Sequence, residues 1–234
     1  GFRLGYLGYV FHEIDKDFEI VGYVDPAPAG SLLAQAWRSG VQLAELPAGI
    51  RPRTLGEGYD VQDRLIEELG GKVVGWKLGV GSPKAKRAAG LARAIAGRVL
   101  GAHRYRPGDT VRLASTNPAT VEFEVAFVLA RDIAPDEPPP APAEVIASGH
   151  VAVELVLARF VDRRAVGWPS FAADDAGFAA LVVGEAIDVA SIPALGASVR
   201  VYVGGKELAR RVVDAGCLAA VHHDQLVKSL QSRG

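Results

Sequence analysis

The 234-residue chain is predicted to be an α+β protein with a helical N-terminal lobe followed by a strand-rich core. Two observations predict this fold class. Between residues 31 and 69, apolar residues recur at intervals of three and four, which places them on one side of a helix. After about residue 107, short apolar or alternating runs are separated by turns that contain proline and glycine, a pattern typical of strands.

The chain divides into three parts. Residues 1–30 form an atypical N-terminal extension, residues 31–106 the helical lobe with the first core strand, and residues 107–234 a β-rich core that we expect to be truncated at its C-terminus. In the extension, residues 18–25 resemble a strand that ends in an acid, Asp25, where a dinucleotide site has its ribose-binding carboxylate. No G-x-G-x-x-G fingerprint accompanies it, so we interpret the extension as divergent sequence.

Three helices and one strand are predicted in the helical lobe. The first helix covers residues 31–43 and ends before two prolines. The second begins at a capping box formed by Thr54 and Glu57 and ends at a pair of glycines. Residues 72–80 form the first core strand, and a third helix spans residues 82 to about 96, with serine as its N-cap and proline in its first turn.

Strands are expected to dominate the second half of the chain. The predicted elements are a turn at 107–109, strands at 110–113 and 120–130, an exposed proline-rich loop at 136–143, strands at 150–158 and 179–183, a hairpin of 199–203 and 207–213 around two glycines, and a closing helix at 218–230.

Composition and charge exclude several classes of protein. A net charge of −1 offers no electrostatic attraction for nucleic acid or an anionic membrane, and pairs such as Arg163–Arg164 are interpreted as solvated. The single cysteine, Cys217, excludes an intramolecular disulfide, and no Cys/His cluster has zinc spacing. No apolar run reaches the ~18 residues of a membrane span. The single cysteine leads us to expect a cytoplasmic, reducing environment.

The strand at 120–130 carries two carboxylates where hydrocarbon would be expected. Side chains alternate along a strand, so Glu122 and Glu124 share one face and apolar residues the other. Glu154 repeats the pattern in a second apolar strand. Like charges on one face repel unless a cation lies between them, so the three acids indicate an oxygen-ligand site for Mg²⁺ or Mn²⁺. The alternative is a solvated outer face, which is the commoner origin of such a pattern.

An ordered set of motifs resembles the 2-keto-4-pentenoate hydratase branch of the fumarylacetoacetate hydrolase superfamily. The set covers roughly residues 31–213, and its order is more specific than any single motif. This resemblance implies a mixed β-roll or β-sandwich core beneath the helical lobe. The motifs are Tyr59-x-x-Gln62, Gly75-Trp-Lys77-Leu-Gly79, Val121-Glu122-Phe-Glu124-Val-Ala-Phe127, Val153-Glu154-Leu-Val-Leu-Ala-Arg159 and Ala173-Asp174-Asp175-Ala-Gly177.

The resemblance also implies roles for seven residues. Those matching metal ligands are Glu122, Glu124 and Glu154. Those matching catalytic residues are Lys77, as an acid/base or a substrate-orienting cation, and Asp174. Those implied to bind substrate are Arg159 and Asp175, although the family typically has asparagine at the second of these positions.

Simpler interpretations exist for four of these side chains. Lys77 would otherwise be a surface cation on an edge strand. Asp174 and Asp175 would cap a helix N-terminus, which aspartate does well. Arg159 holds a carboxylate or extends along the strand end into solvent.

The chemistry implied by the resemblance is hydration of a 2-hydroxy-2,4-dienoate, or its 2-oxo tautomer, to a 4-hydroxy-2-oxo acid, as in aromatic meta-cleavage catabolism. A bound cation would stabilise the enolate charge on the 2-oxygen. Two alternatives stay open: decarboxylation of a 2-oxo-dioate with the same ligands, and a non-catalytic scaffold that acts by association. The family's final strands are not found after residue 214, so we expect an open sheet edge. Either a partner chain covers this edge in a homo-oligomer, or the protein is a shortened and inactive member of the family.

Overall fold

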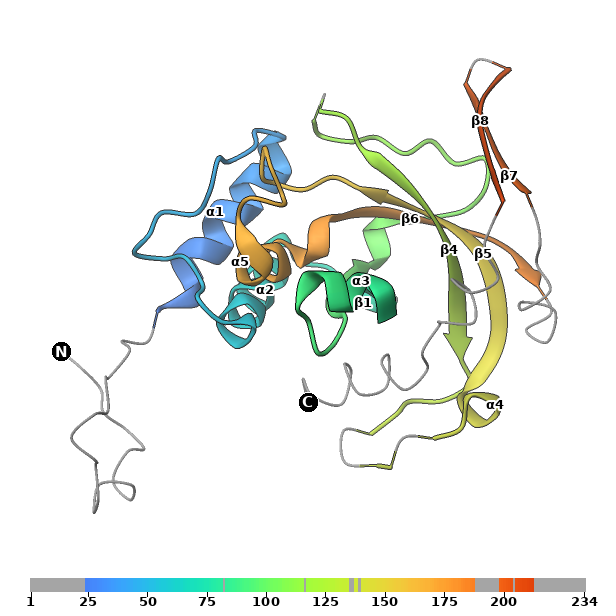
Figure 1. The fold of residues 1–234 in the computed structure, drawn as a ribbon, viewed down its shortest axis with the longest axis horizontal. Helices are drawn as coiled ribbons and strands as arrows, with labels where there is room; N and C mark the ends of the chain where they lie inside the picture. The colour runs from blue at the N-terminus through green and yellow to red at the C-terminus, as the bar shows by residue number, and fades with distance from the viewer. Residues whose placement is uncertain are drawn as a thin grey trace.

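The computed structural model describes residues 24–81, 83–115, 117–134, 137–138, 140–187, 198–203 and 205–212. The predicted strand at 18–25 falls almost wholly outside these residues, and the predicted closing helix at 218–230 lies wholly outside them. In the described part, helices pack beside a curved mixed sheet, and a hairpin stands away from them (Figure 1). The predicted fold class, helical lobe first and strands after it, is confirmed.

The helices are α1 (Pro26–Ser39), α2 (Leu55–Leu69), α3 (Pro83–Ala89), α4 (Pro142–Val145) and α5 (Gly167–Ala173), with 3-10 turns η1 (Gly101–His103) and η2 (Asp175–Gly177). The strands are β1 (Val73–Gly79), β2 (Ile95–Leu100), β3 (Arg104–Tyr105), β4 (Thr120–Leu129), β5 (Ile146–Val156), β6 (Phe178–Ile187), β7 (Ser198–Val203) and β8 (Lys206–Val212). None of the described helices is long and apolar enough to cross a bilayer.

Helix α1 starts earlier and stops sooner than predicted. The Asp25 carboxylate accepts a hydrogen bond of 2.9 Å from the Ala27 amide, and Pro26 occupies the first turn. At the other end Gly40 adopts φ 71, a left-handed conformation that stops the helix before Leu43. Asp25 is therefore a helix cap, and the interpretation of this acid as the end of a strand is wrong.

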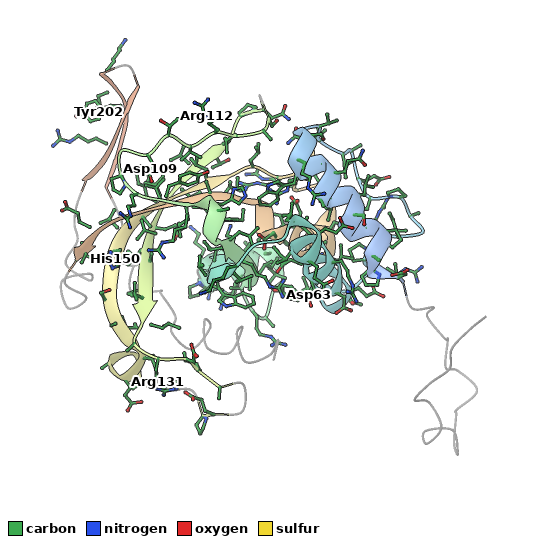
Figure 2. The ribbon with its side chains drawn as sticks, turned by 180° about the vertical axis from the view of Figure 1, so that it is seen from behind. Asp63, Asp109, Arg112, Arg131, His150 and Tyr202 are labelled. Atoms are coloured by element: carbon green, nitrogen blue, oxygen red, sulfur yellow. The ribbon has the colours of Figure 1, made fainter. Side chains whose placement is uncertain are left out.

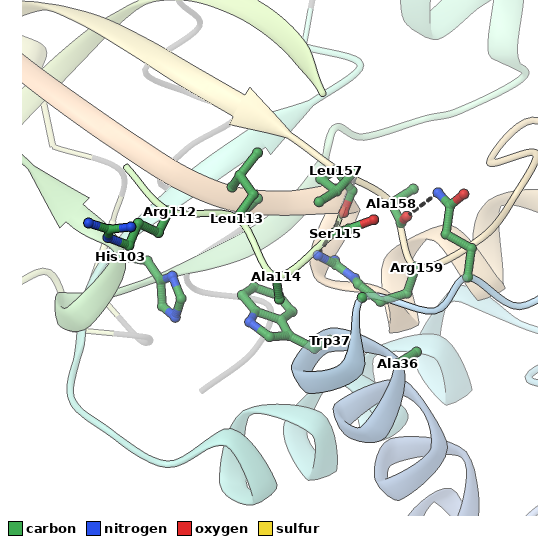
Figure 3. A pocket seen from close by; sticks show the side chains of 13 residues that line it. Ala36, Trp37, His103, Arg112, Leu113, Ala114, Ser115, Leu157, Ala158 and Arg159 are labelled. Atoms are coloured by element: carbon green, nitrogen blue, oxygen red, sulfur yellow. Dashed lines mark hydrogen bonds between the residues drawn. The ribbon is translucent and has the colours of Figure 1, made fainter. Parts of the chain in front are cut away.

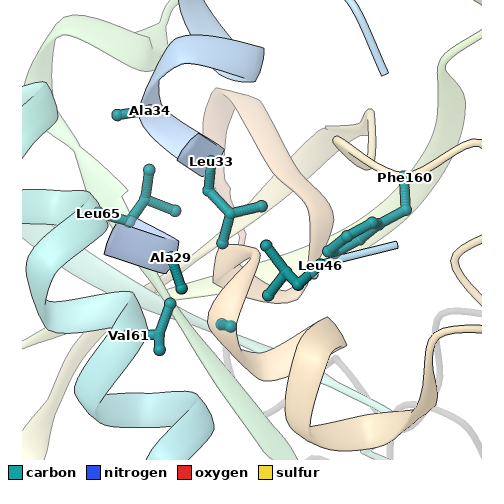
Figure 4. Packing of buried hydrophobic residues seen from close by; sticks show 8 residues of the cluster. Ala29, Leu33, Ala34, Leu46, Val61, Leu65 and Phe160 are labelled. Atoms are coloured by element: carbon teal, nitrogen blue, oxygen red, sulfur yellow. The ribbon is translucent and has the colours of Figure 1, made fainter. Parts of the chain in front are cut away.

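Helix α2 follows the prediction, since the Thr54–Glu57 capping box is present in both directions. The helix packs against α1 and α5 at two glycines. A Cβ on Gly58 would lie 2.3 Å from the carbonyl oxygen of Pro169 in α5, and one on Gly30 would lie 2.5 Å from the Cβ of Arg64. Figure 4 shows the apolar cluster between these elements. Its buried members are Ala29, Leu33, Ala34, Leu46, Val61, Leu65, Phe160 and Ala173.

The main sheet has the order β3-β6-β5-β4. Strand β5 pairs antiparallel with both β4 and β6, whereas β3 pairs parallel with β6. Strand β4 thus forms one edge of the sheet among the described strands, and its apolar face leaves Val121 and Phe123 exposed. Strands β1 and β2 form a separate antiparallel pair, and β7 and β8 form the predicted hairpin.

The third helix was predicted to run to about residue 96, so its predicted C-terminal end, which includes the first two residues of β2, is wrong. Helix α3 ends at Ala89, and Gly90 follows with φ 67. The next segment instead pairs with β1 and is held by α2. The Ala96 amide donates to the Tyr59 hydroxyl (3.0 Å), and the buried Gln62 amide donates to the Ala96 carbonyl (3.0 Å). These contacts span more than thirty residues, so no local pattern reveals them.

Two smaller predictions also differ from the structure. Residues 110–113 follow the expected turn but form no strand, and only β3, before the turn, joins the sheet. The expected proline-rich loop contains the short helix α4 at its end.

Candidate metal site

Three carboxylates meet on one face of the main sheet. In the antiparallel register of β4 and β5, Glu122 lies directly opposite Glu154, and Glu124 lies opposite Ala152. Residues two apart on a strand share a face, so Glu124 follows Glu122 on the side that Glu154 also occupies. One carboxylate oxygen from each acid lies within 4.8 Å of the other two.

Burial and the nearby like charges raise the pKa values of Glu124 and Glu154. Removal of its carboxyl from water, together with the charges of Glu154 and Glu122, raises the pKa of Glu124 to about 7, although the residue as a whole is exposed. Burial also raises the pKa of Glu154, and the Lys77 cation counteracts it.

Lys77 reaches the acids from β1. Its side chain is almost fully buried, and its Nζ lies 2.8 Å from Glu154 Oε1. The same Nζ donates a hydrogen bond of 3.1 Å to the carbonyl oxygen of Ala176 in η2. Lys77 is therefore not a surface cation, and that simpler interpretation is wrong.

Backbone strain is concentrated around Lys77. Of the described non-glycine residues, Val80, Asp175 and Ala176 have positive φ values, of 56°, 52° and 51°. Val80 directly follows β1, and the other two form the turn whose carbonyl accepts from Lys77. Such conformations cost about 1–3 kcal/mol each and tend to occur where a site requires them.

Asp175 anchors this turn to β2. Its Oδ1 accepts a hydrogen bond of 2.6 Å from the Arg98 amide, whereas Oδ2 is buried without a hydrogen-bond partner among the described residues. Gly97 permits the close approach, because a Cβ there would lie 2.6 Å from the Asp175 carbonyl oxygen. Burial raises the pKa of Asp175 to about 7.

Asp174 pairs with Arg159 beneath the same turn. The Arg159 Nε donates to Asp174 Oδ1, and the Arg159 amide donates to Oδ2 at 2.9 Å. The guanidinium also donates to the carbonyls of Phe178 (2.6 Å) and Leu157 (2.9 Å). Burial raises the pKa of Asp174 to about 6 against the opposing charge of Arg159. Asp174 follows α5 and occupies the N-cap position of the 3-10 turn η2, but its side chain makes no capping hydrogen bond there, so the alternative of N-terminal helix capping by this carboxylate is wrong.

The predicted site residues line two different pockets. Lys77 and Glu122 line a pocket of about 440 Å³. Arg159 lines a smaller one of about 100 Å³, where its guanidinium lies 4.2 Å from the Trp37 ring centre and His103 meets the ring edge-on (Figure 3). Burial lowers the pKa of His103. The structure thus brings Lys77 together with the three glutamates, whereas Asp174, Asp175 and Arg159 do not line the larger pocket.

The sequence analysis missed several residues that line the larger pocket. Arg163 Nη2 lies 4.0 Å from Glu122 Oε1, and Arg164, Trp168 and Phe171 line the same space. The arginine pair was interpreted as solvated. Only its position nine residues after Glu154, next to a tryptophan-containing connection, could have suggested otherwise.

The donor set suits a hard divalent cation. Three carboxylates within 4.8 Å of one another offer oxygen ligands only, the kind that Mg²⁺ and Mn²⁺ prefer.

The chain matches no protein-family model and no curated protein sequence. It is similar to two solved structures of 4-oxalocrotonate decarboxylase from Pseudomonas putida G7. The first, complexed with magnesium and adipate, has a TM-score of 0.73 and 18% identity and covers 89% of this chain and 81% of that chain. The second, complexed with calcium and acetate, has a TM-score of 0.70 and 19% identity over the same shares. The likeness shows the fold and confirms the predicted architecture.

Proposed function

We propose that this protein is a divalent-metal-dependent enzyme that acts on a small 2-oxo acid or its 2-hydroxy-dienoate tautomer. The observation that carries the proposal is the convergence of Glu122, Glu124 and Glu154 beside the buried Lys77. The likeness to a decarboxylase solved with magnesium and a dicarboxylate supports it.

In this proposal the three glutamates hold Mg²⁺ or Mn²⁺. The ion, when bound, supplies Lewis-acid stabilisation of the enolate charge on the substrate's 2-oxygen. Lys77 holds or moves a proton at Nζ, and its position is set by its ion pair with Glu154 and by its hydrogen bond to the Ala176 carbonyl. Trp168 and Phe171 shield one side of the pocket from water.

Asp174, Arg159 and Asp175 act in this proposal as positioning residues. The buried Arg159–Asp174 pair fixes the end of α5, and Asp175 ties the following turn to β2. Together they hold the turn with positive φ values in place, so that its Ala176 carbonyl accepts the hydrogen bond from Lys77. Their effect on substrate is therefore expected to pass through the orientation of Lys77.

Two reactions suit this arrangement. In hydration, a proton is delivered to the far end of the dienoate, and water adds to the resulting conjugated 2-oxo acid. In decarboxylation of a 2-oxo-dioate, the bond to the distal carboxylate breaks, CO₂ leaves, and the electron pair passes through the conjugated chain to the 2-oxygen. The arginine pair in the pocket and the decarboxylase likeness favour the second reaction.

The test is turnover of 2-hydroxypenta-2,4-dienoate and of 4-oxalocrotonate, followed by ultraviolet absorbance with Mg²⁺ and with chelator. We expect chelator-sensitive turnover of at least one substrate, and a loss of about 100-fold or more in Glu122→Gln. Glu185→Gln, on the exposed end of β6, is the matched control and should retain activity.

Calorimetric titration with Mg²⁺ provides a readout that does not depend on the reaction. Glu122→Gln should weaken Mg²⁺ binding while the circular dichroism spectrum stays unchanged. If Mg²⁺ binds but neither substrate turns over at high enzyme concentration, the scaffold alternative replaces this proposal.

A further inference from the structure

The charged residues that line the larger pocket carry a net positive charge. Its charged lining residues are Lys77, Arg163, Arg164 and Glu122. The buried Asp174 and Asp175 do not line it. A divalent ion on three ionised glutamates leaves that cluster with one negative charge, whereas the lysine and the two arginines bring three positive ones. The loaded site therefore has a charge near +2.

Arg163 is held only loosely by the protein. Its Nη2 is 4.0 Å from Glu122 Oε1, beyond hydrogen-bond distance, and about a third of its side chain is exposed. An ion pair of this kind contributes little to stability. Once a cation neutralises Glu122, the attraction between the two side chains weakens, and the guanidinium can turn toward a ligand.

The rest of the pocket suits the hydrocarbon part of a short acid. Trp168 and Phe171 from α5 supply apolar walls, and Val80 also lines the pocket. A volume of about 440 Å³ is within the range of small-molecule sites. An acid whose 2-oxo end lies at the glutamates would extend its chain along these walls beside the two arginines.

We propose that Arg163 and Arg164 are specificity-determining residues that bind the second carboxylate of a doubly charged substrate, so that this site selects 2-oxo dicarboxylic acids over 2-oxo monocarboxylic acids. This inference rests on the proposed function and narrows it. Guanidinium groups suit the task because they bind carboxylates through paired N–H donors and always remain charged. In decarboxylation the distal carboxylate leaves as neutral CO₂, so the arginines contribute to binding and selection rather than to lowering the barrier.

The test compares two acids of equal chain length, 2-oxoadipate and 2-oxohexanoate, which differ in the distal carboxylate. Their binding to the Mg²⁺-loaded protein is measured by calorimetry for the wild type, Arg163→Gln and Arg164→Gln. We expect the wild type to bind the diacid about tenfold or more tightly, since a charge-assisted hydrogen bond contributes on that order. Each substitution should remove most of this preference and leave the affinity for the monoacid within about twofold.

Matched controls separate this role from a structural one. Arg131→Gln changes an arginine beside α4, away from the helical lobe and paired with Glu137 (Figure 2), and should keep the full preference. Arg164→Gln should also leave Mg²⁺ affinity unchanged. With turnover substrates, the arginine variants should raise KM for the diacid with kcat little changed.

The outcomes distinguish this inference from the proposed function. Mg²⁺-dependent binding of both acids with equal affinity, or equal weakening of both acids in the arginine variants, overturns the assignment while the proposed function stands. Binding of neither acid, with or without Mg²⁺, overturns both.

Discussion

Lys77 Nζ lies 2.8 Å from Glu154 Oε1, and both side chains are less than a tenth exposed. One residue comes from β1 and the other from β5, so this ion pair joins the two-stranded sheet to the main sheet. A buried pair of charges is strongly destabilising when only one member is removed, because the other charge is left without compensation. The pair therefore links the stability of the fold to the candidate metal site.

Lys77→Met is expected to lower the free energy of unfolding by about 3–5 kcal/mol without divalent ions. Saturating Mg²⁺ should recover part of this loss, because a cation on Glu154 replaces the missing charge. Urea denaturation with and without Mg²⁺ measures both effects. Lys72→Met, just before β1 and exposed, is the control. A loss that Mg²⁺ leaves unchanged would contradict cation binding at Glu154.

Asp175→Asn is expected to stabilise the protein at pH 8 but not at pH 4.5. Burial raises the pKa of Asp175 in the folded state to about 7, above its unfolded value of about 3.9. Between these two pKa values the folded state keeps the carboxyl protonated while the unfolded state has released the proton. The wild type therefore loses stability as the pH rises from about 4 to about 7. Asparagine removes that loss, with a gain at pH 8 on the order of 2–4 kcal/mol. Thermal or urea unfolding across pH checks it, with the exposed Asp60→Asn as control. A gain independent of pH would count against a buried, titrating carboxyl.

Gln62→Leu is expected to destabilise the fold by about 2–4 kcal/mol. Gln62 is fully buried and donates to the carbonyls of Ala96 and Ala172, which would lose their partner in an apolar setting. Gln35→Leu, the same change at an exposed position of α1, should alter stability by less than about 0.5 kcal/mol. Equal effects in the two variants would show that the hydrogen bonds from the Gln62 side chain to Ala96 and Ala172 contribute nothing to stability.

Gly58→Ala and Gly56→Ala are expected to act in opposite directions although both lie in α2. Alanine at position 58 would place its Cβ 2.3 Å from the Pro169 carbonyl oxygen and push α2 away from α5, at a cost of about 1–3 kcal/mol. At position 56 the nearest atom is 3.8 Å away, so the better helix former should stabilise by about 0.5–1 kcal/mol. Melting temperatures of the two variants provide the check, and a gain in both would refute the close helix contact.

Local sequence patterns predicted the parts of the fold that depend on neighbouring residues. The Thr54–Glu57 capping box places the start of α2 because its hydrogen bonds close within one turn. The alternation around Glu122 and Glu124 identifies β4 and the face its acids share, since side chains of a strand alternate.

What the sequence could not provide depends on distant contacts. Strand β2 follows a run of alanines and glycines that is compatible with a helix, and only β1 and the side chains of α2 select the strand. The same holds for the role of Arg163, which depends on how the segment after β5 returns toward β4. Arg159 and Asp174 form a buried ion pair that no local pattern reveals, and their roles in substrate binding and catalysis stay predictions.

The opposition of Glu122 and Glu154 across β4 and β5 has a consequence for folding. A slip of one residue in this pairing would turn Glu122 and Glu124 to the reverse side of the sheet. A divalent ion would then find only one of its three ligands. Cation affinity and correct strand alignment are thus thermodynamically linked, and the ion would favour the aligned sheet over every misaligned competitor.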